Sequence, residues 1–222
     1  MAIREDPSDI WEFKRPGIAV DVVLLTIIDG ELKVGLIKRE EDPYHGKHAL
    51  PGRFVRYEES ITDTARIAIE SKGNIKANGI YLEQLYTFGD NLDRDTRIRT
   101  ISIVYYGLVK AEVIDRQKES KFRWEPVYGL PPLAFDHADI IKSAVERIRE
   151  KLFHTGIIFN LLPNEFTLSE LQHAFEIVLN DSLDKRNFRK KMNEIYVLKD
   201  TRKTRMEGAH RPAALYSYVK TR

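Results

Sequence analysis

The spacing of apolar residues predicts a mixed α/β region in the first two thirds of the chain. Runs rich in β-branched residues predict strands at 18–28, 31–38, 80–88, 100–109 and 124–128. Apolar residues three or four positions apart predict two amphipathic helices, at 60–71 and 136–152. An Asp-Gly pair at 29–30 predicts a hairpin turn. Ser60 is suited to cap the first helix and Gly73 to end it.

A second pattern begins beyond a predicted linker at 153–163, which would separate a domain at 1–152 from the rest. Thr167 and Glu170 have the spacing of a capping box, which predicts the start of a helix. A basic helix is expected from about Asp184 to Ile195, and its inward residues are Phe188, Met192 and Ile195. Strands are then expected at 196–199 and 213–219, separated by a basic polar segment at 201–211. Two helices and a two-stranded wing predict a winged helix-turn-helix over residues 164–222.

Composition and charge narrow the class of protein. The 222-residue chain has no Cys, which excludes disulfides, zinc thiolate sites and a thiol nucleophile. Its apolar runs are too short to span a membrane and its charged N-terminus lacks a signal-peptide core, so we expect a cytoplasmic protein with no membrane partner. Between residues 184 and 211, ten basic residues stand against four acidic ones. Charge alone leaves two interpretations open, a nucleic-acid surface and a solvated helix.

The segment from residue 52 to residue 73 resembles the Nudix box, G-x5-E-x7-R-E-U-x-E-E-x-G-U. The matching residues are Gly52, Glu58, Arg66, Glu70 and Gly73. Ile67 and Ser71 stand where that motif has Glu, which leaves Glu70 alone on one helix face. Because Mg²⁺ prefers several oxygen ligands, the resemblance implies a Nudix fold that binds a ligand and has lost hydrolysis. Arg53 follows Gly52 where active members have a second glycine.

Further segments resemble the Nudix-related transcriptional regulators of the NrtR and AraR type. They lie at residues 88–90, 94–97, 101–106, 133–137, 166–172, 184–189 and 211–216. The resemblance implies an α/β Nudix-type αβα sandwich followed by a small winged helix-turn-helix domain. It implies a ligand-responsive regulator of sugar or NAD-related metabolism with no enzymatic activity. The implied partners are a double-stranded DNA operator, a second copy of the chain in a homodimer, and a sugar or nucleotide-sugar effector such as ADP-ribose or a pentose derivative.

The candidate binding residues follow from the chemistry of each domain. Arg and Asn side chains pair with base edges and Lys with phosphate, so DNA contacts are expected on the two helices and the wing. The DNA-binding candidates are Thr167, Ser169, Lys185, Arg186, Asn187, Arg189, Lys190, Lys191, Arg202, Lys203, Arg205 and Arg211. Guanidinium groups bind phosphate, and carboxylates suit sugar hydroxyls. The effector-binding candidates are Arg53, Glu58, Glu70, Asp93, Arg94, Arg97, Arg99, Asp136 and His137.

Several of these assignments have a structural alternative. The loop at 90–99 is also consistent with a segment held by its own salt bridges, and Asp136 lies where a helix N-cap belongs. Glu70 has the spacing to pair with Arg66. No cofactor or metal site is predicted, although weak Mg²⁺ binding at Glu58, Glu59 and Glu70 stays open. The alternative function is a Mg²⁺-dependent Nudix hydrolase that acts on ADP-ribose-like nucleoside diphosphate derivatives.

Overall fold

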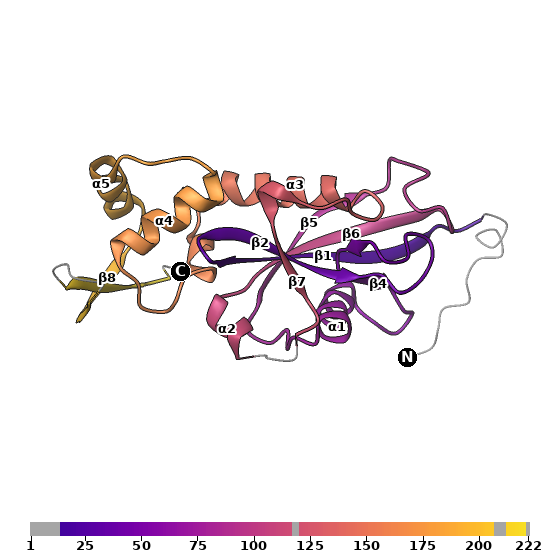
Figure 1. The fold of residues 1–222 in the computed structure, drawn as a ribbon, viewed down its shortest axis with the longest axis horizontal. Helices are drawn as coiled ribbons and strands as arrows, with labels where there is room; N and C mark the ends of the chain where they lie inside the picture. The colour runs from indigo at the N-terminus through magenta and orange to yellow at the C-terminus, as the bar shows by residue number, and fades with distance from the viewer. Residues whose placement is uncertain (1–13, 117–119, 207–211, 221–222) are drawn as a thin grey trace.

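The computed structural model describes residues 14–116, 120–206 and 212–220. Figure 1 shows an elongated molecule with a sheet and its covering helices toward one end. Two helices and a β-hairpin form the other end. No helix in the described part of the chain has the length and apolar character needed to cross a membrane.

Seven strands form the larger sheet. They are β1 (Gly17–Ile28), β2 (Glu31–Lys38), β3 (His48–Ala49), β4 (Gly52–Phe54), β5 (Tyr81–Phe88), β6 (Thr100–Leu108) and β7 (Arg123–Pro126). The main order is β3-β2-β1-β6-β5, with β4 paired to β1 and β7 paired to β2. Strand β1 runs parallel to β6 and is buried along most of its length, which fits its mostly apolar sequence, interrupted by Asp21 and Thr26. The five predicted strands are confirmed, while β3 and β4 are too short to leave a periodic signal.

Helices cover both faces of this sheet, as predicted for an αβα sandwich (Figure 1). They are α1 (Ile61–Gly73) and α2 (Ala111–Asp115) on one face and α3 (His137–Lys151) on the other, with a 3-10 turn, η2 (Val127–Gly129), after β7. The cap predicted at Ser60 is confirmed, because its side chain accepts the N–H of Asp63 at 3.1 Å. Helix α1 ends at Gly73, also as predicted. A Cβ on Gly73 would lie 2.0 Å from the ring of Phe122, so any larger residue here would require that ring to move.

The C-terminal part is the predicted winged helix-turn-helix. Its elements are α4 (Leu168–Leu179), α5 (Lys185–Ile195), β8 (Leu198–Arg205) and β9 (Ala213–Tyr218). The capping box of Thr167 and Glu170 is confirmed at the start of α4. Two expectations are wrong. Ile195 is 38% exposed, because it lies in the last turn of α5 beyond the buried Phe188 and Met192. Strand β8 continues to Arg205 through the segment predicted as a polar excursion, because strand pairing requires only backbone groups.

The segment predicted as a linker is packed against both parts of the molecule. It contains the 3-10 helix η3 (Gly156–Asn160), in which Ile157 and Ile158 are buried. The ring of Phe159 stacks on Tyr218 of β9 with centroids 3.9 Å apart. One hydrophobic cluster runs from the sheet through α3 to α4. The predicted bounds of the two domains stay a prediction.

Candidate functional site

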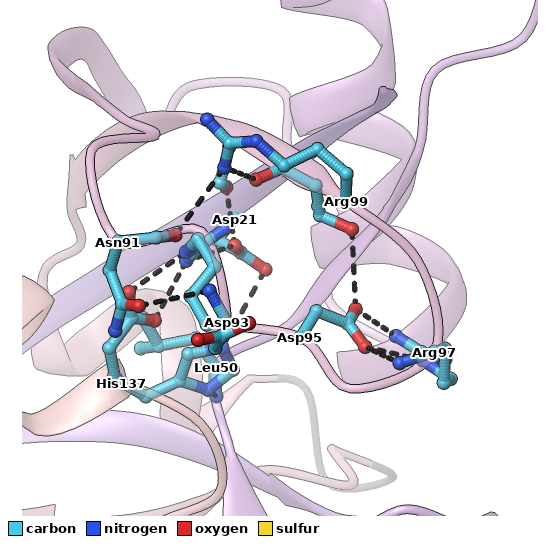
Figure 2. A network of polar contacts seen from close by, with 12 residues as sticks. Asp21, Leu50, Asn91, Asp93, Asp95, Arg97, Arg99 and His137 are labelled. Carbon is cyan, nitrogen blue, oxygen red and sulfur yellow. Dashed lines mark hydrogen bonds and ion pairs between the residues drawn. The ribbon is translucent and has the colours of Figure 1, made fainter. Parts of the chain in front are cut away.

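A cavity of about 260 Å³ lies where β1, β2 and β4 meet the loop between β5 and β6 and the start of α3. Four of the predicted effector residues line it: Arg53, Arg94, Arg97 and His137. Figure 2 shows Asp21 of β1, Asp95 and Arg97 of the loop and His137 of α3 in the polar network around it. The sheet and α3 therefore bring together side chains that are more than a hundred positions apart in the sequence.

The most buried charged group at the cavity is Arg94, which is 7% exposed. Its Nε and Nη2 donate to the two carboxylate oxygens of Asp136 at 2.8 and 2.7 Å. Asp21 lies 3.9 Å from the same guanidinium group and accepts the hydroxyl of Ser102. Burial acts to lower the pKa of Arg94, but the bonds to Asp136 outweigh it and the pKa is raised. Arg94 therefore stays charged and links the loop to the first residues of α3.

His137 is buried beside this pair. Its Nδ1 accepts the backbone N–H of Leu50 at 2.9 Å, and its Nε2 lies 3.9 Å from Asp21. Burial lowers the pKa of His137, with Asp21 acting weakly in the opposite direction. The imidazole is therefore neutral near pH 7. It holds Leu50, in the short segment between β3 and β4.

Arginine and aromatic side chains form another wall of the cavity. Arg97 makes a bidentate ion pair with Asp95, at 3.0 and 2.8 Å, and its guanidinium carbon lies 5.7 Å from the Phe54 ring centre and 5.6 Å from that of Phe135. Arg39 lies 4.8 Å from the Phe135 ring centre. Phe135 has a φ of 53°, a strained value for a side-chain-bearing residue that is often found at functional sites. This wall offers planar apolar surface next to positive charge.

The other effector candidates do not line the cavity. The side chain of Arg99 donates to the carbonyl of Gly89, and the backbone N–H of Asp93 donates to the side chain of Asn91 at 3.0 Å. Glu58 is exposed. Asp136 acts only through Arg94. These residues shape the loop or lie outside the site.

The structural alternatives for Asp136 and Glu70 are wrong, and the one for the loop at 90–99 is confirmed in part. Asp136 occupies the N-cap position of α3, but its side chain caps no backbone N–H, because Arg94 holds both oxygens. Within the described ranges, Glu70 does not pair with Arg66; its carboxylate accepts the N–H of Ala77 at 3.0 Å. The loop at 90–99 does contain its own salt bridge, between Asp95 and Arg97.

Two of the carboxylates considered for weak magnesium binding, on α1 and just before it, are engaged by protein groups. Glu70 is held by a backbone N–H, and the hydroxyl of Ser71 donates to the carbonyl of Ile67 at 2.6 Å. Glu59 pairs with Arg53 at 3.1 Å. The residues that the structure describes contain no group of three or more His, Asp or Glu side chains suited to a metal ion. Since Mg²⁺ prefers several oxygen ligands, these side chains are a poor donor set for it. Weak Mg²⁺ binding at Glu58, Glu59 and Glu70 stays a prediction.

Helix α5 presents a basic face away from the core. The residues Lys185, Arg186, Asn187, Arg189 and Lys190 are all exposed on it, while Phe188 and Met192 anchor it inside. Lys191 is exposed as well, and its ammonium group lies 3.6 Å from the ring centre of Phe153. Ser169 is exposed at the start of α4, whereas Thr167 is buried in the capping box.

The wing candidates differ in how they are held. Lys203 pairs with Glu165 at 2.7 Å, and Arg205 pairs with Glu170 at 2.6 Å. Arg202 is exposed at the bulge of β8 with a φ of 60°. Arg211 lies outside the described residues. The role of each side chain in DNA contact stays a prediction.

Sequence reasoning missed Asp21, Arg39, Phe54, Lys72 and Phe135, which also line the cavity. Arg39, at the end of β2, carries no motif, because only sheet pairing places it near the loop. Phe135 lies in a segment that contributed to the family resemblance, and this was the only signal for it.

Comparison with known proteins identifies relatives that share these two parts. Residues 158–218 match the sequence model of the NrtR DNA-binding winged helix domain. The chain is 33% identical over 216 residues to the "ADPR responsive transcriptional repressor NtrR" of Acinetobacter baylyi, covering 94% of this chain and 84% of that protein. It is also 36% identical over 136 residues to an ADP-ribose pyrophosphatase of Methanocaldococcus jannaschii, covering 59% of this chain and 74% of that protein.

Solved structures agree with these relatives. Shewanella oneidensis NrtR in complex with a 27mer DNA superposes with a TM-score of 0.80 at 34% identity, over 91% of this chain and 93% of that one. The Nudix domain of the same protein, in complex with ADP ribose, matches with a TM-score of 0.52 at 32% identity, over 65% of this chain and 94% of that one. The fold and site thus define a Nudix-type sensor domain joined to a winged helix. The chain belongs to the NrtR family of transcriptional regulators.

Proposed function

We propose that the chain is an ADP-ribose-responsive transcriptional repressor. The similarity to the Acinetobacter repressor carries this proposal, because it extends over 94% of the chain and so includes both the sensor and the reader. The Nudix-type domain binds the effector, the winged helix binds an operator, and the two sites are coupled. A DNA-binding regulator of this kind works in the cytoplasm.

The chemistry of the cavity supports a nucleotide-sugar effector. The rings of Phe54 and Phe135 provide apolar surface for a flat base, and Arg97 lies within 6 Å of both ring centres. Guanidinium groups bind phosphate oxygens through paired N–H groups. Asp21 supplies a buried acceptor for a sugar hydroxyl. Most of the lining residues are charged or polar, which suits an effector that carries phosphates and sugar hydroxyls.

The exposed face of α5 supports sequence reading in the major groove. Arg186, Asn187 and Arg189 are exposed near the start of this helix, and such side chains pair with guanine or adenine edges. We propose that two copies bind a pseudo-palindromic operator, with half-sites separated by about one helical turn of DNA or a multiple of it. We also propose that the domain is catalytically inactive, because the carboxylates of Glu70 on α1 and of Glu59 just before it are engaged by protein partners.

The decisive experiment is fluorescence anisotropy of the DNA upstream of the chain's own gene, titrated with the full-length protein. ADP-ribose should move the titration midpoint, because an effector that prefers one of two conformations shifts the equilibrium between them. The direction of the shift distinguishes release from recruitment. Free and phosphorylated pentoses form the comparison arm. If a pentose moves the midpoint and ADP-ribose does not, the effector is a pentose and not ADP-ribose. If the chain does not bind the DNA, the proposal is refuted.

The similarity to the Methanocaldococcus enzyme favours a second candidate, a Mg²⁺-dependent ADP-ribose pyrophosphatase. This activity needs a metal ion to bridge phosphates and activate water. The described residues contain no group of three or more His, Asp or Glu side chains that could hold one, which speaks against this candidate. We expect no turnover of ADP-ribose by the purified chain with Mg²⁺. Turnover that disappears in Glu70→Gln would establish the enzyme.

A further inference from the structure

Two cationic side chains at the effector cavity have no anionic partner. Five cations line the cavity, and three are paired: Arg53 with Glu59, Arg94 with Asp136 and Arg97 with Asp95. The other two are Arg39 and Lys72. Among the residues that the structure describes, neither forms an ion pair. Their charges are therefore available to a ligand.

Arg39 is fixed in place by neutral groups. Its Nε donates to the carbonyl oxygen of Pro43 at 2.8 Å and its Nη2 to that of Glu41 at 3.1 Å. Carbonyl oxygens orient a guanidinium group without neutralising it. Burial lowers the pKa of Arg39 and the nearby charge of Arg97 lowers it further, while Asp95, Glu41 and Asp42 act in the opposite direction. The guanidinium group is thus oriented at the cavity without an ion pair to any described carboxylate, and a bound anion would relieve the repulsion from Arg97.

Lys72 lies in the last turn of α1, next to the positions where Glu is replaced. It lines both the effector cavity and the adjoining groove, which it shares with Arg39. Among the described residues that line the effector cavity itself, the other charged group without an ion pair is the exposed Glu41. The end of α1 therefore presents an ammonium group to the cavity instead of a cluster of carboxylates.

We propose that Arg39 and Lys72 are the diphosphate-binding pair of this cavity, and that the cavity takes the diphosphate of its effector without a metal ion. The inference rests on the proposed function, in which the effector is ADP-ribose. The two phosphates of such a molecule carry about one negative charge each. Arg39 supplies paired N–H donors and Lys72 a point charge, so together they match that charge. A site with carboxylate ligands would need a divalent cation for the same purpose.

The test is isothermal titration of the full-length chain with ADP-ribose, once in EDTA and once in Mg²⁺. We expect the two dissociation constants to agree within about twofold. Arg39→Gln and Lys72→Gln should each weaken binding about tenfold or more, which corresponds to about 1.4 kcal/mol. Lys142→Gln, on the exposed side of α3, is the matched control and should leave binding unchanged. Glu41→Gln should strengthen binding, because it removes a repelling charge.

The outcomes separate this inference from the proposed function. Binding that requires Mg²⁺ would overturn the inference and leave the ADP-ribose effector standing. Binding in EDTA that survives Lys72→Gln would overturn it as well. No binding of ADP-ribose in either buffer would instead refute the proposed effector. Because Arg39 also holds a loop, circular dichroism should accompany its variant; if that variant unfolds, Lys72→Gln on the exposed end of α1 decides the question.

Discussion

Replacing Asp136 with Asn should destabilise the sensor domain by about 3 kcal/mol. The Asp136 side chain is 18% exposed and that of its partner Arg94 only 4%, and two charge-assisted hydrogen bonds join them. Removing one partner of a buried pair costs about 3–5 kcal/mol, because the other charge is left uncompensated. The partial exposure of Asp136 and the nearness of Asp21, 3.9 Å from Arg94, place the expected loss at the lower end.

The measurement is urea unfolding followed by tryptophan fluorescence, with Asp139→Asn as the control. Asp139 lies exposed in the first turn of the same helix, so its loss should cost only about 0.3–1 kcal/mol through the helix dipole. The double variant Arg94→Met with Asp136→Asn should recover part of the loss, because no unpaired charge remains buried. A loss below about 1 kcal/mol for Asp136→Asn, or one equal to that of Asp139→Asn, would refute the reasoning.

Three further predictions concern other parts of the molecule. His137 contributes fully to the free energy of unfolding above its unfolded pKa of about 6.5, and this contribution is lost as the pH falls toward its lowered folded pKa. In urea titrations below about pH 6.5, the free energy of unfolding of His137→Gln should therefore fall less steeply with pH than that of the unchanged protein. Arg186→Gln should reduce the slope of log K against log salt concentration for DNA binding by about 0.9. Lys191→Gln should change that slope less, because the ammonium group of Lys191 lies 3.6 Å from the ring centre of Phe153. Equal reductions in the two variants would show that Lys191 contacts DNA. Gly73→Ala should cost about 1–3 kcal/mol in thermal unfolding, because its Cβ would lie 2.0 Å from Phe122; an unchanged midpoint would show that this ring moves freely.

The local features of the fold were predictable because their causes are local. A capping box needs only Thr167 and Glu170 at the right spacing, and the structure shows both of its bonds. The hairpin turn needs residues that tolerate positive φ, and Asp29 and Gly30 adopt 55° and 75°. The expectation failed at Ile195, because the packing of a last helical turn depends on what lies opposite it and not on periodicity.

The candidate site was only half predictable, because its walls come from distant segments. An arginine-rich loop was recognisable, yet the sequence could not show that Arg97 would pair within the loop while Arg94 reached Asp136, 42 positions away. Arg39 and Phe54 gave no signal, since each is an ordinary residue at a strand end. Their importance arises only where β2 and β4 meet β1.

The sequence by itself determined the order and type of the elements, the loss of acidic ligands on α1 and the basic character of α5, because these depend on residue types at short spacing. The tertiary structure alone decided which charges at the cavity are neutralised. Whether a cation is free depends on the carboxylate that the fold brings within about 4 Å, and such partners lie anywhere in the chain. That is why Arg53, Arg94 and Arg97 are engaged by protein partners while Arg39 and Lys72 form no ion pair with any residue that the structure describes.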